Sequence, residues 1–140
     1  MSGEADGDAG ALRVLHAEDD ELDAEFVRRL TSRVDGDVRL ERVRDGDEAL
    51  ERLGASAARA LPHLVLLDLN MPRLDGHGCL RRIRANPDWD ALHVAILTTS
   101  MRAADRDAAL AGGAADYFVK PLRREAFVEL LDRVRPAPRR

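Results

Sequence analysis

The sequence predicts an α/β protein in which helices cover both faces of a parallel sheet. The strongest sign is the unbroken apolar run at 64–67, which ends at Asp68 and is bounded by prolines at 62 and 72. Such a run, without alternation of polar residues, is typical of a strand that is buried on both faces. Strand-like and helical patterns also alternate along the chain, as crossover connections between parallel strands require. With 140 residues and no internal repeat, the chain has room for one domain.

The first quarter of the chain is expected to hold a leader, a strand and a helix. Residues 1–10 are small and acidic with nothing to bury, which predicts a disordered leader. Residues 12–17 form a short strand that ends at the acidic cluster 18–21. Hydrophobic residues then recur at helical spacing and define the first helix: Leu22, Phe26, Val27, Leu30 and Val34.

The middle of the chain continues the alternation. Residues 38–43 alternate between apolar and charged side chains, which suits a more exposed edge strand. The Asp-Gly-Asp sequence at 45–47 opens a second helix that ends near Gly54. The buried strand described above follows, and after Pro72 a third helix extends to about Asn86, which precedes a proline.

The last third supplies two more strands. Residues 92–97 form a buried strand, and an alanine-rich helix at 102–111 then ends at two glycines. A final strand at 115–119 leads into a helix at 123–134. Residues 136–140 are expected to be a tail.

Composition and charge exclude several classes of function. The net charge of −4 argues against nucleic acid or an anionic membrane as the main partner. The lone cysteine, Cys79, excludes an internal disulfide and a cysteine-based zinc site, and it fits a reducing compartment. No apolar stretch is long enough to span a membrane or to serve as a signal core. We therefore expect a cytoplasmic protein.

The distributions of lysine and histidine along the chain are informative. Of the 22 basic residues, only Lys120 is a lysine, which suggests a site that needs a compact, flexible charge where arginine would impose a planar fork. The four histidines, at 16, 63, 77 and 93, lie in different predicted elements without the spacing of metal ligands. We expect these histidines to be packing or surface residues.

Reactive side chains follow the carboxyl ends of the predicted strands, which share one crevice in an open α/β sheet. They are Glu18, Asp19, Asp68, Thr98 and Lys120. Clustered carboxylates suit Mg²⁺, and a hydroxyl and an ammonium suit the oxygens of a phosphoryl group. Asp68 would then be the nucleophile that forms an acyl phosphate. Taken singly, each residue has an ordinary alternative as a helix cap, a strand end or a salt-bridge partner.

In combination, these motifs make residues 11–135 resemble a response-regulator receiver domain of two-component signalling systems. The resemblance rests on Glu18-Asp19, the sequence Leu-Asp-Leu-Asn-Met-Pro at 67–72 followed by Asp75-Gly76, Thr98, and Tyr-Phe-Val-Lys-Pro at 117–121. It implies a flavodoxin-like (βα)5 three-layer sandwich, with a parallel five-stranded sheet in the order 2-1-3-4-5.

The resemblance also implies a role for each site residue. Asp68 would be the phosphoacceptor, and Mg²⁺ would bind to Asp19, Asp68 and the backbone carbonyl of Asn70. Glu18 stands where the family often has aspartate, so its contact with the metal would pass through water. Thr98 and Tyr117 would act as the switch. Lys120 would pair with a phosphoryl oxygen, and its peptide bond to Pro121 is expected to be cis. Asn70, Thr99 and Ser100 would tune the lifetime of the phosphoryl group.

The implied donor of the phosphoryl group is a sensor histidine kinase. Output is expected to pass through protein contacts, because the chain ends about five residues beyond the last helix. The face made by the segments 102–111, 115–119 and 123–134 would bind a partner or a second copy of the chain. The sequences of the motifs around Asp68 and Thr98 are similar to those of stand-alone regulators associated with phytochromes.

Three other functions compete with this interpretation. An aspartyl-nucleophile phosphatase that resembles haloacid-dehalogenase enzymes would need a second aspartate where this chain has Asn70. A nucleotide- or flavin-binding domain would need glycines rather than acidic residues after the first strand. A degenerate receiver that acts as a scaffold would be expected to lack some of the site residues.

Overall fold

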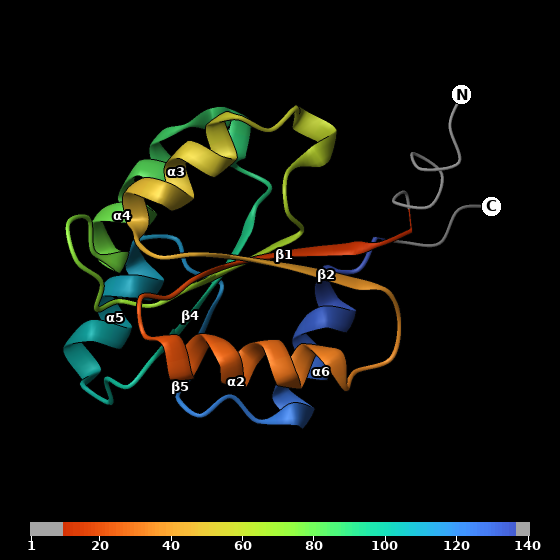
Figure 1. Ribbon diagram of the computed structural model, residues 1–140. Helices are drawn as coiled ribbons and strands as arrows, with labels where there is room; N and C mark the ends of the chain where they lie inside the picture. Colours follow the sequence, from red (N-terminus) through yellow and green to blue (C-terminus); the bar gives the residue numbers. More distant parts are fainter. Residues whose placement is uncertain (1–9, 137–140) are drawn as a thin grey trace.

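The structure is a computed structural model that describes residues 10–136. The expected leader at 1–10 and tail at 136–140 lie outside the described residues, apart from residues 10 and 136. Element labels follow Figure 1. The strands are β1 (Leu12–Ala17), β2 (Val38–Val43), β3 (Leu64–Leu67), β4 (His93–Thr98) and β5 (Asp116–Val119). The helices are α2 (Glu21–Ser32), α3 (Gly46–Gly54), α4 (Gly76–Ala85), α5 (Ala103–Ala111) and α6 (Arg124–Val134), with short 3₁₀ turns η1 (Ala58–Ala60) and η2 (Pro87–Trp89).

The five strands form one parallel sheet in the order β2-β1-β3-β4-β5. Leu15 of β1 pairs with Val65 of β3, which in turn pairs with Val94 of β4. Because neighbouring strands are parallel, their carboxyl ends lie along one edge of the sheet. The predicted α/β class and the flavodoxin-like strand order implied by the resemblance are both confirmed.

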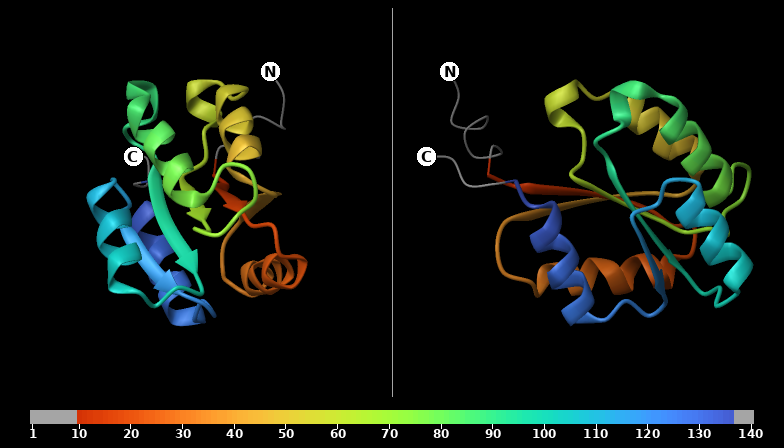
Figure 2. Two further views of the ribbon diagram at one scale, coloured as in Figure 1. Left: turned by 90° about the vertical axis from the view of Figure 1, so that its left-hand side faces the viewer. Right: turned by 180° about the vertical axis from the view of Figure 1, so that it is seen from behind.

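Helices cover both faces of the sheet, which gives three layers (Figures 1 and 2). Side chains of β3 alternate between the two hydrophobic cores and are completely buried in both. Val65 and Leu67 pack on the side of α3, α4 and α5, whereas Leu64 and Leu66 pack on the side of α2 and α6. Each such side chain contributes about 1.5–3 kcal/mol by leaving water. This double burial explains why β3 is an unbroken apolar run.

Aspartates begin three of the helices that follow the strands. Asp20, Asp45 and Asp75 are the N-caps of α2, α3 and α4, and each carboxylate accepts a hydrogen bond from the backbone N–H three residues later. A cap of this kind stabilises a helix by about 1 kcal/mol. These three carboxylates are therefore engaged in helix starts, unlike those of Asp19 and Asp68, which cap no helix.

Two expectations about helices differ from the structure. Leu22 and Phe26 share a helical spacing with buried Val27, but they are 80% and 45% exposed. They lie on the flank of α2 instead of facing the sheet. The helix expected after Pro72 begins only at Gly76, because Arg73 has a positive φ of 64° that turns the chain.

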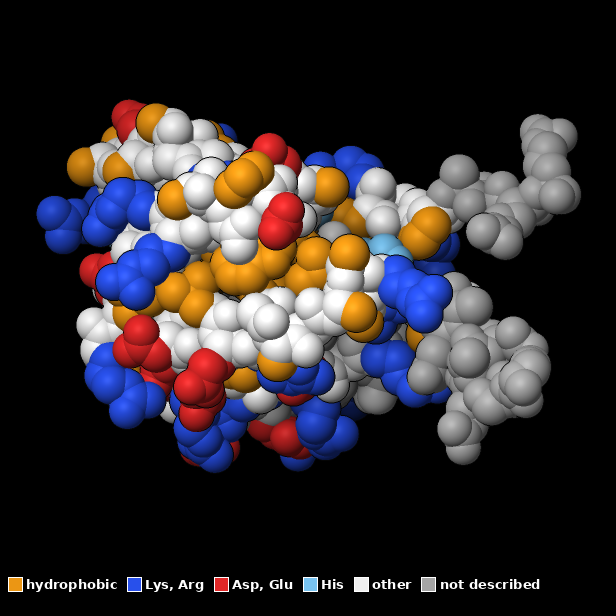
Figure 3. Space-filling model, turned by 90° about the horizontal axis from the view of Figure 1, so that it is seen from above, with side chains coloured by type: hydrophobic (Ala, Val, Ile, Leu, Met, Phe, Trp, Pro, Cys, Tyr) orange, Lys and Arg blue, Asp and Glu red, His pale blue; other side chains and the backbone are white. Residues whose placement is uncertain are grey.

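The surface over α3 and α4 combines hydrophobic and charged side chains. Figure 3 shows a band of hydrophobic side chains across the middle of this face, with arginine and acidic side chains at its margins. Leu50, Leu61 and Trp89 are partly buried and pack against the core on this side of the sheet. Among the described residues, no helix has the length and apolar character needed to cross a bilayer.

The single cysteine is part of this core, and its burial predicts low reactivity. Cys79 on α4 is completely buried. Burial, reinforced by the negative charge of Asp47, raises the pKa of the Cys79 thiol to about 12. At pH 8 only about one molecule in ten thousand then carries the reactive thiolate, and the fraction rises about tenfold per pH unit. We expect a thiol reagent such as DTNB to label Cys79 in denaturant and to leave the native protein unlabelled at pH 8. Rapid labelling of the native protein would contradict this burial.

Candidate functional site

The first two acidic residues of the site follow β1. The N–H of Glu18 donates to the carbonyl of Val43 at 2.9 Å, so the residue continues the pairing of β1 with β2. Its side chain is completely buried, and one carboxylate oxygen, Oε2, accepts a hydrogen bond from the N–H of Asp20 at 3.1 Å. Burial raises the pKa of Glu18 to about 7, although Lys120 opposes the shift. Asp19, next in the chain, is exposed to solvent.

Asp68 follows β3 and is held in the centre of the site. Its N–H donates to the carbonyl of Ala17 at 3.2 Å, which places it beside the end of β1. The side chain is 5% exposed, and Oδ1 accepts a hydrogen bond from the N–H of Asn70 at 3.2 Å. Gly76 supports this turn, because a Cβ at that position would overlap the carbonyl oxygen of Asp68.

Three carboxylates come together at this point. Glu18, Asp19 and Asp68 each offer an oxygen, and these oxygens lie within 4.8 Å of one another. Hard oxygen donors at this separation, one of them exposed, form a donor set that fits a small divalent cation with water in its remaining positions. The buried and exposed carboxylates together give the site a strong negative potential.

Lys120 supplies the positive charge of the site. It follows β5, and its N–H donates to the carbonyl of Thr98 at 2.8 Å. Its ammonium donates to Glu18 Oε1 at 2.7 Å, to Asp23 Oδ2 at 2.7 Å and to Asp68 Oδ2 at 3.0 Å. Partial burial alone would lower the pKa of Lys120, but these three hydrogen bonds outweigh burial and raise it. The side chain is therefore a cation at neutral pH. The expected cis peptide bond to Pro121 is present.

A chain of contacts joins the end of β4 to the start of α5 and to β5. Thr98 is completely buried, and its hydroxyl accepts a hydrogen bond from the N–H of Ser100 at 3.3 Å. The Ser100 hydroxyl donates to Asp105 of α5 at 2.6 Å. The hydroxyl of partly buried Tyr117 donates to the carbonyl of Ser100 at 3.0 Å. Thr99, between the two, is exposed. A movement of this loop would therefore displace both the Thr98 and the Tyr117 side chains.

Sequence reasoning missed two residues that the structure places in the site. Asp23 lies in the first turn of α2, three residues after the N-cap Asp20, and its carboxylate accepts a hydrogen bond from Lys120. His16 was expected to be a packing or surface residue. It lies two positions before Glu18 on β1, and its Nε2 is 3.9 Å from Glu18 Oε1. The period of two along a strand is the signal that could have indicated it.

The other histidines make contacts away from the carboxylate cluster. His93 lies 2.7 Å from Asp116, and the backbone N–H of Arg13 donates to His63 Nδ1 at 3.0 Å. His77 Nε2 is 3.4 Å from Asp105.

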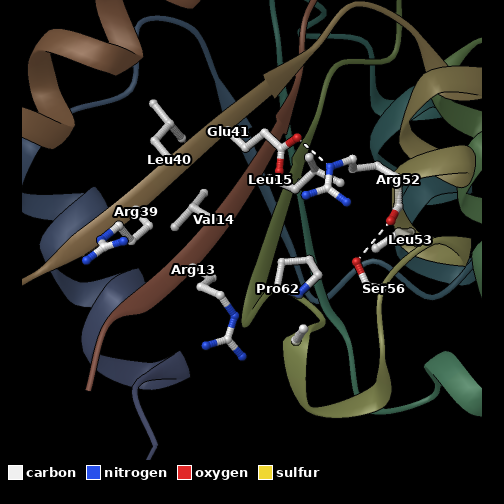
Figure 4. Close-up of a pocket in the computed structure, with 11 residues that line it drawn as sticks. Arg13, Val14, Leu15, Arg39, Leu40, Glu41, Arg52, Leu53, Ser56 and Pro62 are labelled. Atoms are coloured by element: carbon white, nitrogen blue, oxygen red, sulfur yellow. Dashed lines mark hydrogen bonds and ion pairs between the residues drawn. The ribbon is translucent and has the colours of Figure 1, made fainter. Parts of the chain in front are cut away.

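A separate hollow of about 150 Å³ lies between the edge of the sheet and the C-terminal end of α3 (Figure 4). Its guanidinium groups have protein partners. Arg52 donates to Glu41 at 2.5 Å, and Arg13 donates to the carbonyl of Leu61 at 3.0 Å. These charges stabilise the packing of β1, β2 and η1, and the hollow is distant from the carboxyl ends of the strands.

Comparisons with known proteins agree with this geometry. The sequence profile of the response regulator receiver domain matches residues 14–132. The response regulator MprA of Mycobacterium leprae (strain TN) is 39% identical over 129 residues, which are 92% of this chain and 52% of MprA. The chain thus spans about half the length of that relative.

Two solved structures share the fold over 89% of both chains. The Mn²⁺-bound form of the response regulator Rcp1 is 30% identical, with a TM-score of 0.73. The phosphorylated cyanobacterial phytochrome response regulator RcpA is 26% identical, also with a TM-score of 0.73.

Proposed function

Because this chain belongs to the response regulator receiver domain family, we propose that it accepts a phosphoryl group from a sensor histidine kinase on Asp68. One observation carries the choice of Asp68: its buried carboxylate lies between two further carboxylates and the only lysine of the chain. In the reaction, an oxygen of Asp68 attacks the phosphorus of the kinase phosphohistidine. A phosphorus–oxygen bond forms, the phosphorus–nitrogen bond breaks, and the leaving imidazole takes up a proton. Phosphorylation of the chain by acetyl phosphate tests the proposal.

The donor set supports Mg²⁺ as the cofactor. Asp19, Asp68 and the backbone carbonyl of Asn70 would hold the ion, and Glu18 would contact it through water. When bound, the metal offsets the negative charge that gathers on the transferred oxygens. Lys120 binds a phosphoryl oxygen from the other side, since its flexible ammonium can turn from a carboxylate of the cluster to the new group.

This assignment predicts a specific loss of metal binding in the variant Asp19→Asn. The substitution removes one of the three clustered charges from the exposed edge of the site, so we expect the Mg²⁺ affinity to fall about tenfold or more. Isothermal titration calorimetry measures it. Asp20→Asn is the matched control, because Asp20 caps α2 and asparagine is an equally good cap. Equal Mg²⁺ affinity in the Asp19→Asn variant and the wild type would contradict the proposed ligand set.

Thr98 and Tyr117 form the proposed switch. A phosphoryl group on Asp68 would draw the Thr98 hydroxyl toward an oxygen and away from the N–H of Ser100. Tyr117 would respond because its hydroxyl is bonded to the same loop. Such a two-state movement, biased by local charge, is a common way to pass on a phosphorylation signal. Asn70, Thr99 and Ser100 follow the strand ends that carry Asp68 and Thr98, and they would tune the lifetime of the phosphoryl group.

The surface beside Lys120 offers a place for the kinase. Leu22 and Phe26, the large hydrophobic residues exposed on α2, line a hollow of about 320 Å³ together with Pro121 and Leu122. Apolar side chains exposed next to a reactive group are a typical protein-binding feature. They explain why the hydrophobic stripe of α2 extends beyond the core.

A different surface would carry the output signal. Large hydrophobic side chains are exposed on and beside α5, β5 and α6, among them Met101, Leu110, Val119 and Val128. A downstream protein or a second copy of the chain could cover this face, whose arrangement changes with Tyr117. The likeness to RcpA, a phytochrome response regulator, supports a kinase of the phytochrome class as the source of the signal. We place this exchange in the cytoplasm as part of the same proposal.

A further inference from the structure

His16 is a buried side chain whose place in the site needs a physical reason. It is 1% exposed, and neither ring nitrogen has a hydrogen-bond partner among residues 10–136. Buried polar atoms are nearly always paired, so an unpaired one in a native structure needs an explanation, such as a functional role or a bound water or ion. The residues before it on the same face of β1, Leu12 and Val14, are ordinary core residues. A hydrophobic side chain would therefore suit position 16 if packing were its only role.

The surroundings of His16 keep its ring neutral. Burial, together with the positive charges of Lys120 and Arg42, lowers the pKa of His16 to about 4, against the opposing effect of Asp68. A neutral imidazole has one N–H donor and one acceptor nitrogen. Arg42, the register partner of His16 on β2, has a buried Nη2 that can only donate and that also lacks a partner within the described part of the chain. If Nδ1 of the neutral His16 ring accepts a hydrogen bond from Arg42, the single ring proton lies on Nε2.

Nε2 is the nitrogen that faces the site. It lies 3.9 Å from Glu18 Oε1, slightly too far for a hydrogen bond. The same oxygen is bound by the ammonium of Lys120 at 2.7 Å. If Lys120 turns to a phosphoryl oxygen on Asp68, Glu18 Oε1 loses this donor while its side chain stays completely buried. An unpaired buried carboxylate oxygen is strongly unfavourable.

We propose that His16 is a positioning residue that replaces Lys120 as the hydrogen-bond donor to Glu18 when Lys120 binds the phosphoryl group. The inference rests on the proposed function, because it requires a phosphoryl group that attracts Lys120. A movement of the ring or the carboxylate by about 1 Å closes the present gap to hydrogen-bonding distance. Glu18 then keeps its orientation in the activated state, and Lys120 is released without leaving a buried carboxylate oxygen unpaired.

Nitrogen NMR of the full chain tests this exchange directly. In the wild type with Mg²⁺, addition of beryllofluoride as a phosphoryl mimic should shift the His16 Nε2–H proton downfield and slow its exchange with water by about tenfold or more. An Nε2 without a proton, or an Nε2–H signal that beryllofluoride leaves unchanged in a protein that binds it, overturns the proposal. A wild type that fails to bind beryllofluoride contradicts the proposed function instead.

Two substitutions at position 16 distinguish hydrogen-bond donation by His16 from its contribution to packing. His16→Leu fills the space without a donor and should weaken beryllofluoride binding about tenfold, whereas His16→Gln retains an N–H and should restore most of the affinity. His63→Gln, at the opposite end of the sheet, is the matched control and should bind like the wild type. Equal beryllofluoride affinities for His16→Leu and His16→Gln would overturn the proposal. Circular dichroism melts of both variants show whether a loss of folding contributes.

Discussion

Asp68→Asn is expected to abolish phosphorylation of the chain by acetyl phosphate and Mg²⁺, with a fall in the rate of more than about a hundredfold. The amide lacks the anionic oxygen that attacks phosphorus. The substitution also removes a negative charge from a site in which three carboxylate oxygens lie within 4.8 Å. Intact-protein mass spectrometry gives the measurement, since one phosphoryl group should add to the wild type and none to the variant.

Asp75→Asn is the matched control for this experiment. Asp75 lies in the same loop, but its carboxylate caps α4 by accepting a hydrogen bond from Gly78, and asparagine can do the same. We expect it to be phosphorylated like the wild type. Phosphorylation that persists in Asp68→Asn would show that another side chain is the acceptor, and a thermal melt of each variant shows whether both remain folded.

The fold could be predicted from the sequence because the order of apolar and polar residues along each strand reflects which of its faces are buried. The strand β3 is apolar at every position because helices cover both sides of it, and β2 alternates because it lies at the edge. The capped helix starts at Asp20 and Asp45 are equally local features. The exposure of Leu22 and Phe26 could not be predicted in this way. Spacing shows that residues share a helix face, but the position of that face over the sheet depends on tertiary packing.

In the candidate site, too, some features could be predicted from the sequence and others could not. Glu18, Asp19, Asp68 and Lys120 could be grouped because parallel strands bring their carboxyl ends to one edge. The carboxylates that Lys120 contacts could not be predicted, because a flexible side chain binds the acceptors that lie nearest to it in the folded protein. The contact with Asp23 depends on where the first turn of α2 lies, and the neighbourhood of His16 depends on the side of β1 that faces the ammonium. Both are consequences of packing, which one sequence pattern does not determine.

Lys120→Arg is expected to preserve the charge of the site and still impair the switch. The lysine ammonium places three hydrogen bonds of 2.7–3.0 Å around one atom, to Glu18, Asp23 and Asp68. A guanidinium is planar and larger, and its donors lie in a fixed fork, so it cannot reproduce this cluster in a side-chain position that is 12% exposed. We expect overpacking to destabilise the fold by about 1–3 kcal/mol.

The effect on signalling should be larger than the effect on stability. Since Asp68 and the carboxylates remain, the Arg variant should still accept a phosphoryl group. However, it should lose most of the change that beryllofluoride causes in the NMR signals of the Tyr117 ring, because no compact ammonium is free to turn to the new group. Arg133→Lys, an exchange between the same two residue types at a surface ion pair with Asp116, is the matched control and should switch normally. If Lys120→Arg shows the wild-type Tyr117 response, a positive charge alone suffices at this position. The bias of the chain toward arginine would then have no bearing on the one lysine that it retains.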